Sequence, residues 1–210
     1  MGHLALGWVN LFDVIFGSTK SPGESIVKAT ELAQKVQAMD DSLSMGHSLL
    51  GFIYLIIREH DKAVAEGERA VALEPNGSWA NQFLANSLVY AGRSKEAIPL
   101  LQKAIRLNPF CKHETFTMFG NALSRTGRFE EAVSAYKKSI QRAPDNIFAH
   151  LGLAATHIAL GREKEARAEA AEVLRINPKF SLDDHAKIVP YKDQSAIDRY
   201  IGALRKAGLK

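Results

Sequence analysis

The sequence contains a single cysteine, Cys111, among its 210 residues, so no disulfide bond can form within the chain. A lone thiol fits a protein of a reducing compartment. Hydrophobic residues make up 46% of the sequence and charged residues 24%, which fits a folded protein and argues against disorder. We therefore expect a cytoplasmic protein whose fold depends on packing alone.

The chain also lacks an apolar run long enough to cross a bilayer. Its most apolar stretch, MGHLALGWVNLFDVIFG, is short and contains Asp13. This stretch has no basic segment of the kind that begins a signal peptide, and Leu6 stands where N-myristoylation requires Ser or Thr. We therefore expect no direct membrane insertion.

Motifs that would indicate catalysis are missing as well. There is no G-x-S-x-G, no P-loop and no G-x-G-x-x-G, and the S-x-x-K spacing at Ser134 lies inside a predicted helix without its companion motifs. His150 and His157 share one face of a predicted helix, but no carboxylate or thiol is placed by the sequence to complete a metal site. The sequence predicts a protein that is not an enzyme and has no cofactor and no metal site.

Proline is sparse, but four of the seven prolines recur at a regular interval. They are spaced 34, 35 and 34 residues apart, and they are Pro75, Pro109, Pro144 and Pro178. A period of this length is typical of a repeated helix–turn–helix unit. It defines four frames, with Lys112 as a one-residue insertion: 44–77, 78–111, 113–146 and 147–180.

Small residues recur in these frames where two helices must pack closely. Position 20 is always alanine, at Ala63, Ala97, Ala132 and Ala166. Position 15, where the first helix of a frame ends, is Gly92, Gly127 or Gly161 in three frames and Arg58 in the first. A residue with a Cβ is strained in the left-handed conformation that ends a helix. We therefore expect the turn at Arg58 to be more strained than the three turns with glycine.

This pattern resembles the tetratricopeptide repeat over residues 44–180, with small residues at positions 8 and 20 and proline at position 32. The resemblance implies an all-α fold, a right-handed superhelical solenoid of antiparallel helix pairs, with about twelve helices in the whole chain. It also implies a concave groove built mainly from the first helix of each pair. Ankyrin repeats are excluded because no TPLH-like phrase is present.

The N-terminal segment, residues 1–43, looks like a degenerate fifth helix pair with an enlarged turn, GSTKSPGES. Its first helix is apolar nearly all round, whereas a terminal repeat normally presents a polar outer face. We expect this helix to be covered by a partner or by further chain, or alternatively by the enlarged turn itself. The residues that would mediate self-association are Trp8, Leu11, Phe12 and Ile15.

The C-terminal segment, residues 181–210, breaks the period of the repeat. Asp193 or Ser195 can cap a helix that ends at Gly208. Because solenoids need capping, we expect these residues to form capping helices on the fourth repeat. The alternative is a tail that occupies the groove.

Longer phrases of the chain resemble one group of repeat proteins in particular. These phrases are GWVNLFDVIFG, GFIYLIIREHDKAVAEGERAVALEPNG, YAGRSKEAIPLLQKAIRLNP and FSLDDHAKIVPYKD. They are similar to the C-terminal tetratricopeptide regions that follow class III adenylate/guanylate cyclase domains in some bacterial proteins. The resemblance implies the regulatory or sensory region of a signalling protein, without its catalytic domain.

In this fold, five positions of each first helix face the groove. The candidates for partner binding are Phe52, Leu55, Ile56, Trp79, Gln82, Asn86, Val89, Tyr90, Asn121 and Arg125. Aromatic anchors beside amide side chains suit an amphipathic helix or an extended peptide. A clamp for acidic C-termini is not matched, because Ser48 and Phe52 stand where it requires Lys and Asn. The alternative is that the apolar candidates pack within the array, since a large exposed apolar patch is unusual.

The net charge of +4 and the isoelectric point near 9.1 permit an acidic partner without requiring one. Arg125 is the only basic groove candidate, and Glu114 opposes it in the same frame, so no nucleic-acid partner is expected. We expect a protein–protein interaction scaffold that binds a protein or peptide, or that assembles into a homo-oligomer. The alternative is an effector-binding sensor, or an enzyme domain without a recognisable motif.

Overall fold

The computed structural model describes residues 2–15 and 18–210, and over these residues it consists of twelve α-helices joined by turns. The helices are α1 Gly2–Ile15, α2 Pro22–Met39, α3 Ser44–Ile56, α4 His60–Leu73, α5 Ser78–Tyr90, α6 Ser94–Leu107, α7 His113–Arg125, α8 Phe129–Arg142, α9 Ile147–Ala159, α10 Glu163–Ile176, α11 Leu182–Ile188 and α12 Gln194–Lys206. In the described part of the chain, no helix is both long and apolar enough to span a membrane.

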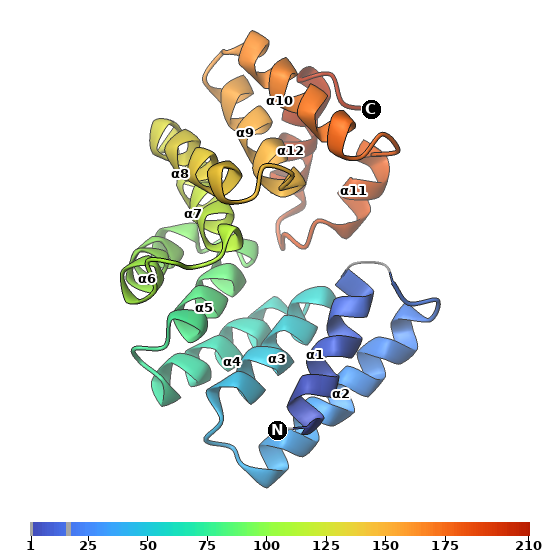
Figure 1. Cartoon of the computed structure of the whole chain (residues 1–210), viewed down its shortest axis with the longest axis vertical. Helices are drawn as coiled ribbons and strands as arrows, with labels where there is room; N and C mark the ends of the chain where they lie inside the picture. Colours follow the sequence, from blue (N-terminus) through green and yellow to red (C-terminus); the bar gives the residue numbers. More distant parts are fainter. Residues whose placement is uncertain (1, 16–17) are drawn as a thin grey trace.

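The first ten helices form five pairs that stack along the sequence into a solenoid. In each pair an A helix (α1, α3, α5, α7 or α9) packs against the B helix that follows it, and each B helix packs against the next A helix. Neighbouring A helices also contact one another and form the inner, concave face. The pairs follow a curved path from α1 to α10 in Figure 1. The superhelical arrangement expected from the repeat pattern is confirmed.

Small residues allow the helices to approach closely. The alanines at position 20 of the four frames are fully buried: Ala63, Ala97, Ala132 and Ala166. The ring of Tyr136, 1% exposed, lies between Gly120 and Gly152, where added Cβ atoms would come within 2.6 and 2.5 Å of the ring. Such distances leave no space for a methyl group, so glycine is required at both positions.

The A–B turns of the four repeat frames differ in one place. Gly92, Gly127 and Gly161 adopt φ angles of 85°, 79° and 71°, and Arg58 takes the same left-handed conformation at 62°. A left-handed conformation costs a residue with a Cβ roughly 1–2 kcal/mol. The strained turn expected at Arg58 is therefore present.

The C-terminal helices leave the regular stack. In that stack an A helix packs on the preceding B helix, whereas α12 packs mainly on α9, which is an A helix. Ile197, Ile201 and Leu204 of α12 are buried in the same core as repeats two to four. In Figure 1 α12 and α11 lie beside α9 and α10, at the end of the curved path. As the sequence indicated, Asp193 caps α12 by accepting a hydrogen bond from the Ser195 amide.

The N-terminal pair continues the stack, with α1 against both α2 and α3. Within the enlarged turn the amide of Ser18 donates to the Asp13 carbonyl at 2.8 Å. Phe16 and Gly17 lie outside the described part of the chain. That the enlarged turn covers α1 stays a prediction.

Candidate functional site

The concave face divides into two halves with different surfaces. The N-terminal half carries an aromatic cluster, which we define as Trp8, Phe12, Phe52, Trp79 and Phe83. The C-terminal half is covered by the strap and by α12 itself. We define the strap as residues 187–192, which comprise the last two residues of α11 and the segment that leads toward α12.

The aromatic cluster joins helices α1, α3 and α5. The indole of Trp8 lies 5.5 Å from the Phe52 ring and 5.8 Å from the Trp79 ring, both edge-on, and Phe52 lies 4.8 Å from Phe83. These separations and orientations are favourable for aromatic pairs. The rings therefore fix one another in place and make this half of the groove a preformed surface.

The cluster has a buried base and an exposed rim. Trp8 and Phe83 are 8% and 1% exposed, whereas Phe12 and Trp79 are 41% and 36% exposed. Met45, which has the same repeat position in α3 as Trp79 has in α5, is exposed as well. A ligand could thus contact apolar side chains that are already held by packing beneath them.

The backbone of the strap is held by side chains at the junction between α3 and α4. The Arg58 guanidinium donates hydrogen bonds to the carbonyls of Lys187 and Val189, at 2.8 and 3.2 Å. His60 Nε2 donates to the Pro190 carbonyl at 2.7 Å. Residues about 130 positions apart in the sequence are therefore brought together at the groove.

The end of the strap is held by α4 and α5. The Lys192 amide donates to the Tyr90 carbonyl at 2.9 Å, and the Lys192 ammonium pairs with Asp61 at 2.7 Å. This ion pair is solvent-exposed, and the neighbouring cation lowers the pKa of the Asp61 carboxyl. Being exposed, the pair adds little stability by itself and mainly fixes the position of Lys192.

Tyr191 of the strap inserts its side chain among groove residues. Its ring lies 5.3 Å from the Tyr90 ring, and the Arg125 guanidinium lies 4.1 Å from its centroid. Burial raises the pKa of Tyr191, although the Arg125 charge opposes that effect. Burial likewise raises the pKa of Tyr90. Both phenols are therefore neutral and act as apolar surfaces with a hydroxyl donor.

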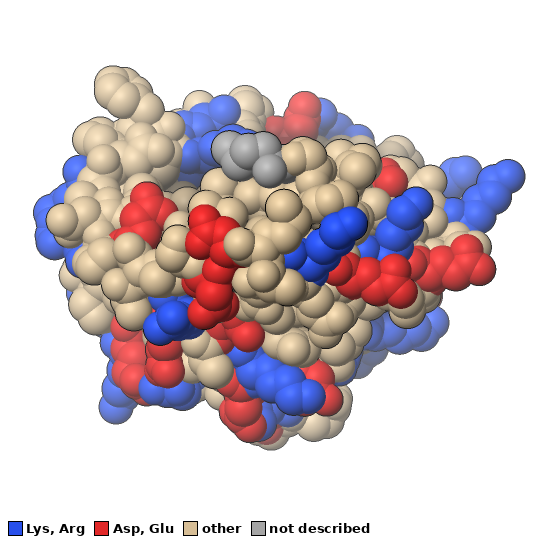
Figure 2. Space-filling view, turned by 90° about the horizontal axis from the view of Figure 1, so that it is seen from below, with Lys and Arg blue, Asp and Glu red and all other residues tan. Residues whose placement is uncertain are grey.

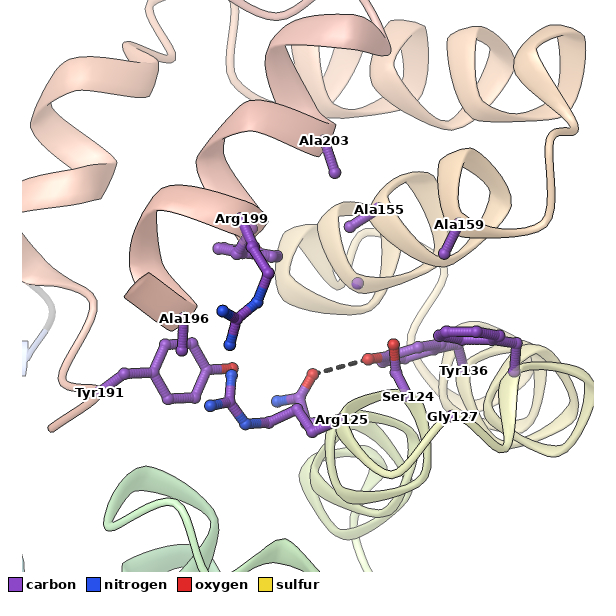
Figure 3. A pocket seen from close by; sticks show the side chains of 14 residues that line it. Ser124, Arg125, Gly127, Tyr136, Ala155, Ala159, Tyr191, Ala196, Arg199 and Ala203 are labelled. Atoms are coloured by element: carbon purple, nitrogen blue, oxygen red, sulfur yellow. Dashed lines mark hydrogen bonds between the residues drawn. The ribbon is translucent and has the colours of Figure 1, made fainter. Parts of the chain in front are cut away.

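A cavity of about 450 Å³ remains between α7, α9 and α12, beside Tyr191. Figure 3 shows the side chains of Arg125 and Arg199 on the side of the cavity where Tyr191 lies. The Tyr136 hydroxyl donates to Asn121 Oδ1 at 2.7 Å in its wall. The cavity has two guanidinium groups and no carboxylate among its lining residues, so its chemistry favours an anion.

The structure separates the predicted groove residues into three groups. Phe52 and Trp79 belong to the aromatic cluster, and Tyr90 and Arg125 contact the strap. Asn121 lines the cavity. The groove positions therefore contribute to three distinct sites along the concave face.

Other predicted groove residues do not present a free surface. Leu55 and Val89 are 4% and 0% exposed, because both pack into the core, so their assignment to the groove surface was wrong. Asn86 is 8% exposed. Ile56 packs against the N-terminal core, and Gln82 Oε1 accepts a hydrogen bond from Thr115 at 2.6 Å.

The self-association residues are placed differently from one another. Trp8 and Leu11 are buried, at 8% and 0% exposed, because α1 packs on α2 and α3; neither offers the exposed surface that was expected of it. Phe12 is at the surface, and the side chain of Ile15 lies outside the described residues. Leu6 and Val9, which the sequence analysis did not select, are each 54% exposed. Their spacing with Phe12, three residues apart each time, was the available signal.

His150 has the carboxylate partner that the sequence analysis did not find. Its Nδ1 lies 2.6 Å from Glu169 Oε2 and its Nε2 lies 2.9 Å from the Pro144 carbonyl. Both partners are acceptors, so the imidazolium satisfies both, and the Glu169 hydrogen bond raises the pKa of His150. His47 and Glu66 form the same pair in the first repeat. Among the described residues, no three candidate ligands gather into a metal site.

Charges of both signs are interspersed on the face that Figure 2 shows. Opposite charges also pair on the described helices, as Arg128 does with Glu131 and Arg175 with Asp145. The visible face therefore has no extended basic patch of the kind that binds nucleic acid.

Two family models for the tetratricopeptide repeat match the sequence, one over residues 80–111 and one over residues 123–185. The chain contains tetratricopeptide repeats. Proteins built from these repeats are protein-interaction scaffolds that bind proteins or peptides and are generally not enzymes.

Solved tetratricopeptide structures share the fold. PilW, a type IV pilus biogenesis factor, has a TM-score of 0.72 at 18% identity and covers 95% of this chain and 89% of its own. YrrB, described as a tetratricopeptide protein with an unusual peptide-binding site, has a TM-score of 0.60 at 23% identity over 83% of this chain and 89% of its own. At these identities the likeness concerns the fold alone.

A curated relative is small glutamine-rich tetratricopeptide repeat-containing protein 2 of Mycosarcoma maydis. It is 30% identical over 121 residues, which are 56% of this chain and 33% of that protein. The chain spans well under half the length of the curated relatives that it matches.

Proposed function

We propose that the chain is a non-catalytic scaffold that binds a segment of a partner protein, an amphipathic helix or an extended peptide, at the aromatic cluster. The observation that carries this proposal is the difference between the two halves of the concave face. The strap and α12 already cover the C-terminal half, whereas Phe12 and Trp79 leave an apolar rim accessible in the N-terminal half.

The cluster has the properties of an anchoring surface for a side chain. Its exposed rings rest on buried rings, so little side-chain entropy is lost when a partner binds. Aromatic anchors of this kind commonly supply most of the energy of a peptide complex. The peptide-binding site reported for YrrB is consistent with such a use of the fold.

The test is a selection of displayed peptides on the full chain, followed by titration of the enriched peptides. Both tryptophans of the sequence belong to the cluster, so intrinsic fluorescence reports directly on binding there. Trp79→Ala should weaken binding by about tenfold or more, which corresponds to the loss of one anchor. Phe148→Ala is the matched control, because Phe148 has the same repeat position in α9 and is 57% exposed. Peptides that bind Trp79→Ala as tightly as the unmodified chain would contradict the proposal.

Self-assembly through the exposed apolar residues of α1 is a second proposal, and it rests on a different observation. Leu6, Val9 and Phe12 lie three residues apart on α1 and are each more than 40% exposed. Light scattering after size-exclusion chromatography should show a dimer that Leu6→Glu with Val9→Glu abolishes. A monomer at every concentration would contradict it.

The alternative of an effector-binding sensor is favoured by the cavity beside Tyr191. Arg125 and Arg199 would bind the charged group of a small carboxylate or phosphate, and Tyr200 would contact its apolar part. Phenyl phosphate and benzoate are suitable probes in a thermal-shift titration, with Arg199→Gln as the variant that should lose the shift. No shift with either probe would count against a sensor.

We also propose that the chain belongs to a cyclase-type bacterial signalling protein, on the sequence resemblance alone. We propose a cytoplasmic location because the sequence has a single cysteine.

A further inference from the structure

The strap lies in the groove in the manner of a bound peptide. Three of its carbonyls accept hydrogen bonds from Arg58 and His60, and its last amide donates to the Tyr90 carbonyl. These contacts recognise main-chain atoms. Any extended segment of suitable shape could therefore make them.

Two further contacts depend on the side chains of the strap. The Tyr191 ring packs against the Tyr90 ring and beneath the Arg125 guanidinium, and Lys192 pairs with Asp61. The strap therefore contacts a defined surface, which we call the strap site: Arg58, His60, Asp61, Tyr90 and Arg125.

Arg58 indicates that the strap site is specifically formed. It has a φ angle of 62°, whereas the α5–α6, α7–α8 and α9–α10 turns use glycine in this conformation. Backbone strain at a residue with a Cβ persists where the surrounding contacts determine its position. Here the side chain that glycine would lack is the one that donates to two strap carbonyls.

The strap is held by apolar packing as well as by polar contacts. Its Val189 and Tyr191 side chains are buried in the main core with Ile201 and Leu204 of α12, and hydrogen bonds and an ion pair with a largely exposed Asp61 position its backbone. Buried side chains of this kind act as the anchors of a bound peptide. The strap lies outside the four repeat frames, so displacing it removes no part of a repeat.

From these observations we infer that the strap site binds a second protein, through an extended segment with an apolar residue, a proline, a tyrosine and a lysine in consecutive positions. Val189–Lys192, with the sequence VPYK, is the internal segment that competes with it. This site is separate from the aromatic cluster, so the inference does not depend on the function proposed above.

The internal segment has a concentration advantage over a partner. A tethered segment acts at an effective concentration on the order of millimolar. A partner segment at micromolar concentration therefore binds strongly only when the strap is weakened or displaced. Weakening one strap contact should reveal the site to a peptide added in trans.

The experiment uses a fluorescein-labelled peptide with the sequence of residues 187–193, KIVPYKD, and the full chain, with binding followed by anisotropy. Lys192→Glu places like charges at the Asp61 contact, so the strap is weakened and the peptide should bind this variant about three- to tenfold more tightly than the unmodified chain. Lys187→Glu is the control, because the Lys187 side chain pairs with Asp184 on α11 and not with the strap site. It should bind the peptide as the unmodified chain does.

Charge reversal at Asp61 adds a test of specificity. Asp61→Lys places like charges at the Lys192 contact, so it also weakens the strap, and it should reject KIVPYKD and prefer a peptide in which aspartate replaces its second lysine. A peptide with alanine in place of tyrosine should bind Lys192→Glu more weakly than KIVPYKD.

Circular dichroism confirms that each variant is folded. Equal peptide affinity for the unmodified chain, Lys192→Glu and Lys187→Glu would overturn the inference, and so would no binding to folded Lys192→Glu at millimolar peptide. Dimers of Lys192→Glu that form by exchange of straps, seen by light scattering, would overturn it in favour of a second copy as the occupant.

Discussion

The two halves of the concave face are built from the same repeat, yet one presents its side chains and the other has them covered. Trp79 in the N-terminal half keeps an exposed face, whereas Tyr90 and Arg125, farther along the groove, contact Tyr191 of the strap. The repeat frame is the same in both halves, so it does not determine which groove residues are accessible. The C-terminal segment, which lies outside the frame, does.

The largest effect on stability should come from core substitutions that destabilise one half of the solenoid more than the other. Leu204 of α12 and Leu11 of α1 are both fully buried, but in different clusters. Leu204→Ala and Leu11→Ala should each lower the free energy of unfolding by about 2–5 kcal/mol. In urea denaturation, Leu11→Ala should shift the unfolding transition that is followed by tryptophan fluorescence. Leu204→Ala should shift the transition followed by circular dichroism more than the one followed by tryptophan fluorescence. Identical shifts by both probes would show that the halves unfold as one unit.

A smaller effect should come from the contact between repeats three and four. In Gly152→Ala the new methyl group would lie 2.5 Å from the Tyr136 ring, so overpacking should cost about 1–3 kcal/mol. Gly202→Ala in α12 is the control, because nothing lies within 4 Å of the added atom and alanine favours the helix by up to about 1 kcal/mol. Equal melting temperatures for the two variants would contradict this account of the packing.

The His150–Glu169 pair should give a pH-dependent contribution of about 1 kcal/mol. The folded-state pKa of His150 is raised above its usual 6.5, so this contribution is fully present below that value and is lost as the pH rises through the folded-state pKa. Urea titrations between about pH 6 and pH 8 should therefore show a smaller fall in stability for His150→Asn than for the unmodified chain. If stability fell with pH by the same amount in both proteins, the His150–Glu169 pair would be excluded as the cause of the fall.

The smallest net effect is expected at Arg58. Arg58→Gly relieves roughly 1 kcal/mol of left-handed strain and loses hydrogen bonds of similar value, so stability should change by less than about 0.5 kcal/mol. Arg58→Ala keeps most of the strain and loses the same bonds, so it should be about 1 kcal/mol less stable. Thermal denaturation of the two variants measures the difference. A less stable glycine variant would show that the strain has been overestimated.

The sequence predicted the regular part of the fold because its signals are local. Regularly spaced prolines, glycines at the turns and buried alanines act within one repeat or between neighbours, as Gly92 and Ala97 illustrate. The strain at Arg58 was predictable for the same reason. Periodicity describes such contacts well because each repeat packs mainly on the next.

The candidate site was predicted less completely, for two physical reasons. Repeat position indicates the general face of a helix but not the final depth of a side chain, so the buried Leu55 was grouped with the partly exposed Phe52. The strap contacts join Arg58 to Val189 across 131 positions, outside any repeat frame. From the sequence we expected a cap rather than a tail in the groove. In the structure α12 packs on the fourth repeat, while the strap contacts the groove.

The placement of Tyr136 restricts how the repeats can be rearranged. Its ring, contributed by repeat three, needs a glycine in its own repeat at Gly120 and another in the following repeat at Gly152. In repeats one to three, the position of Gly152 is occupied by Leu49, Phe83 and Met118. None of these side chains would leave space for the Tyr136 ring. Repeats three and four are therefore not interchangeable modules. Duplication, deletion or shuffling of a single repeat here would require a compensating change in its neighbour.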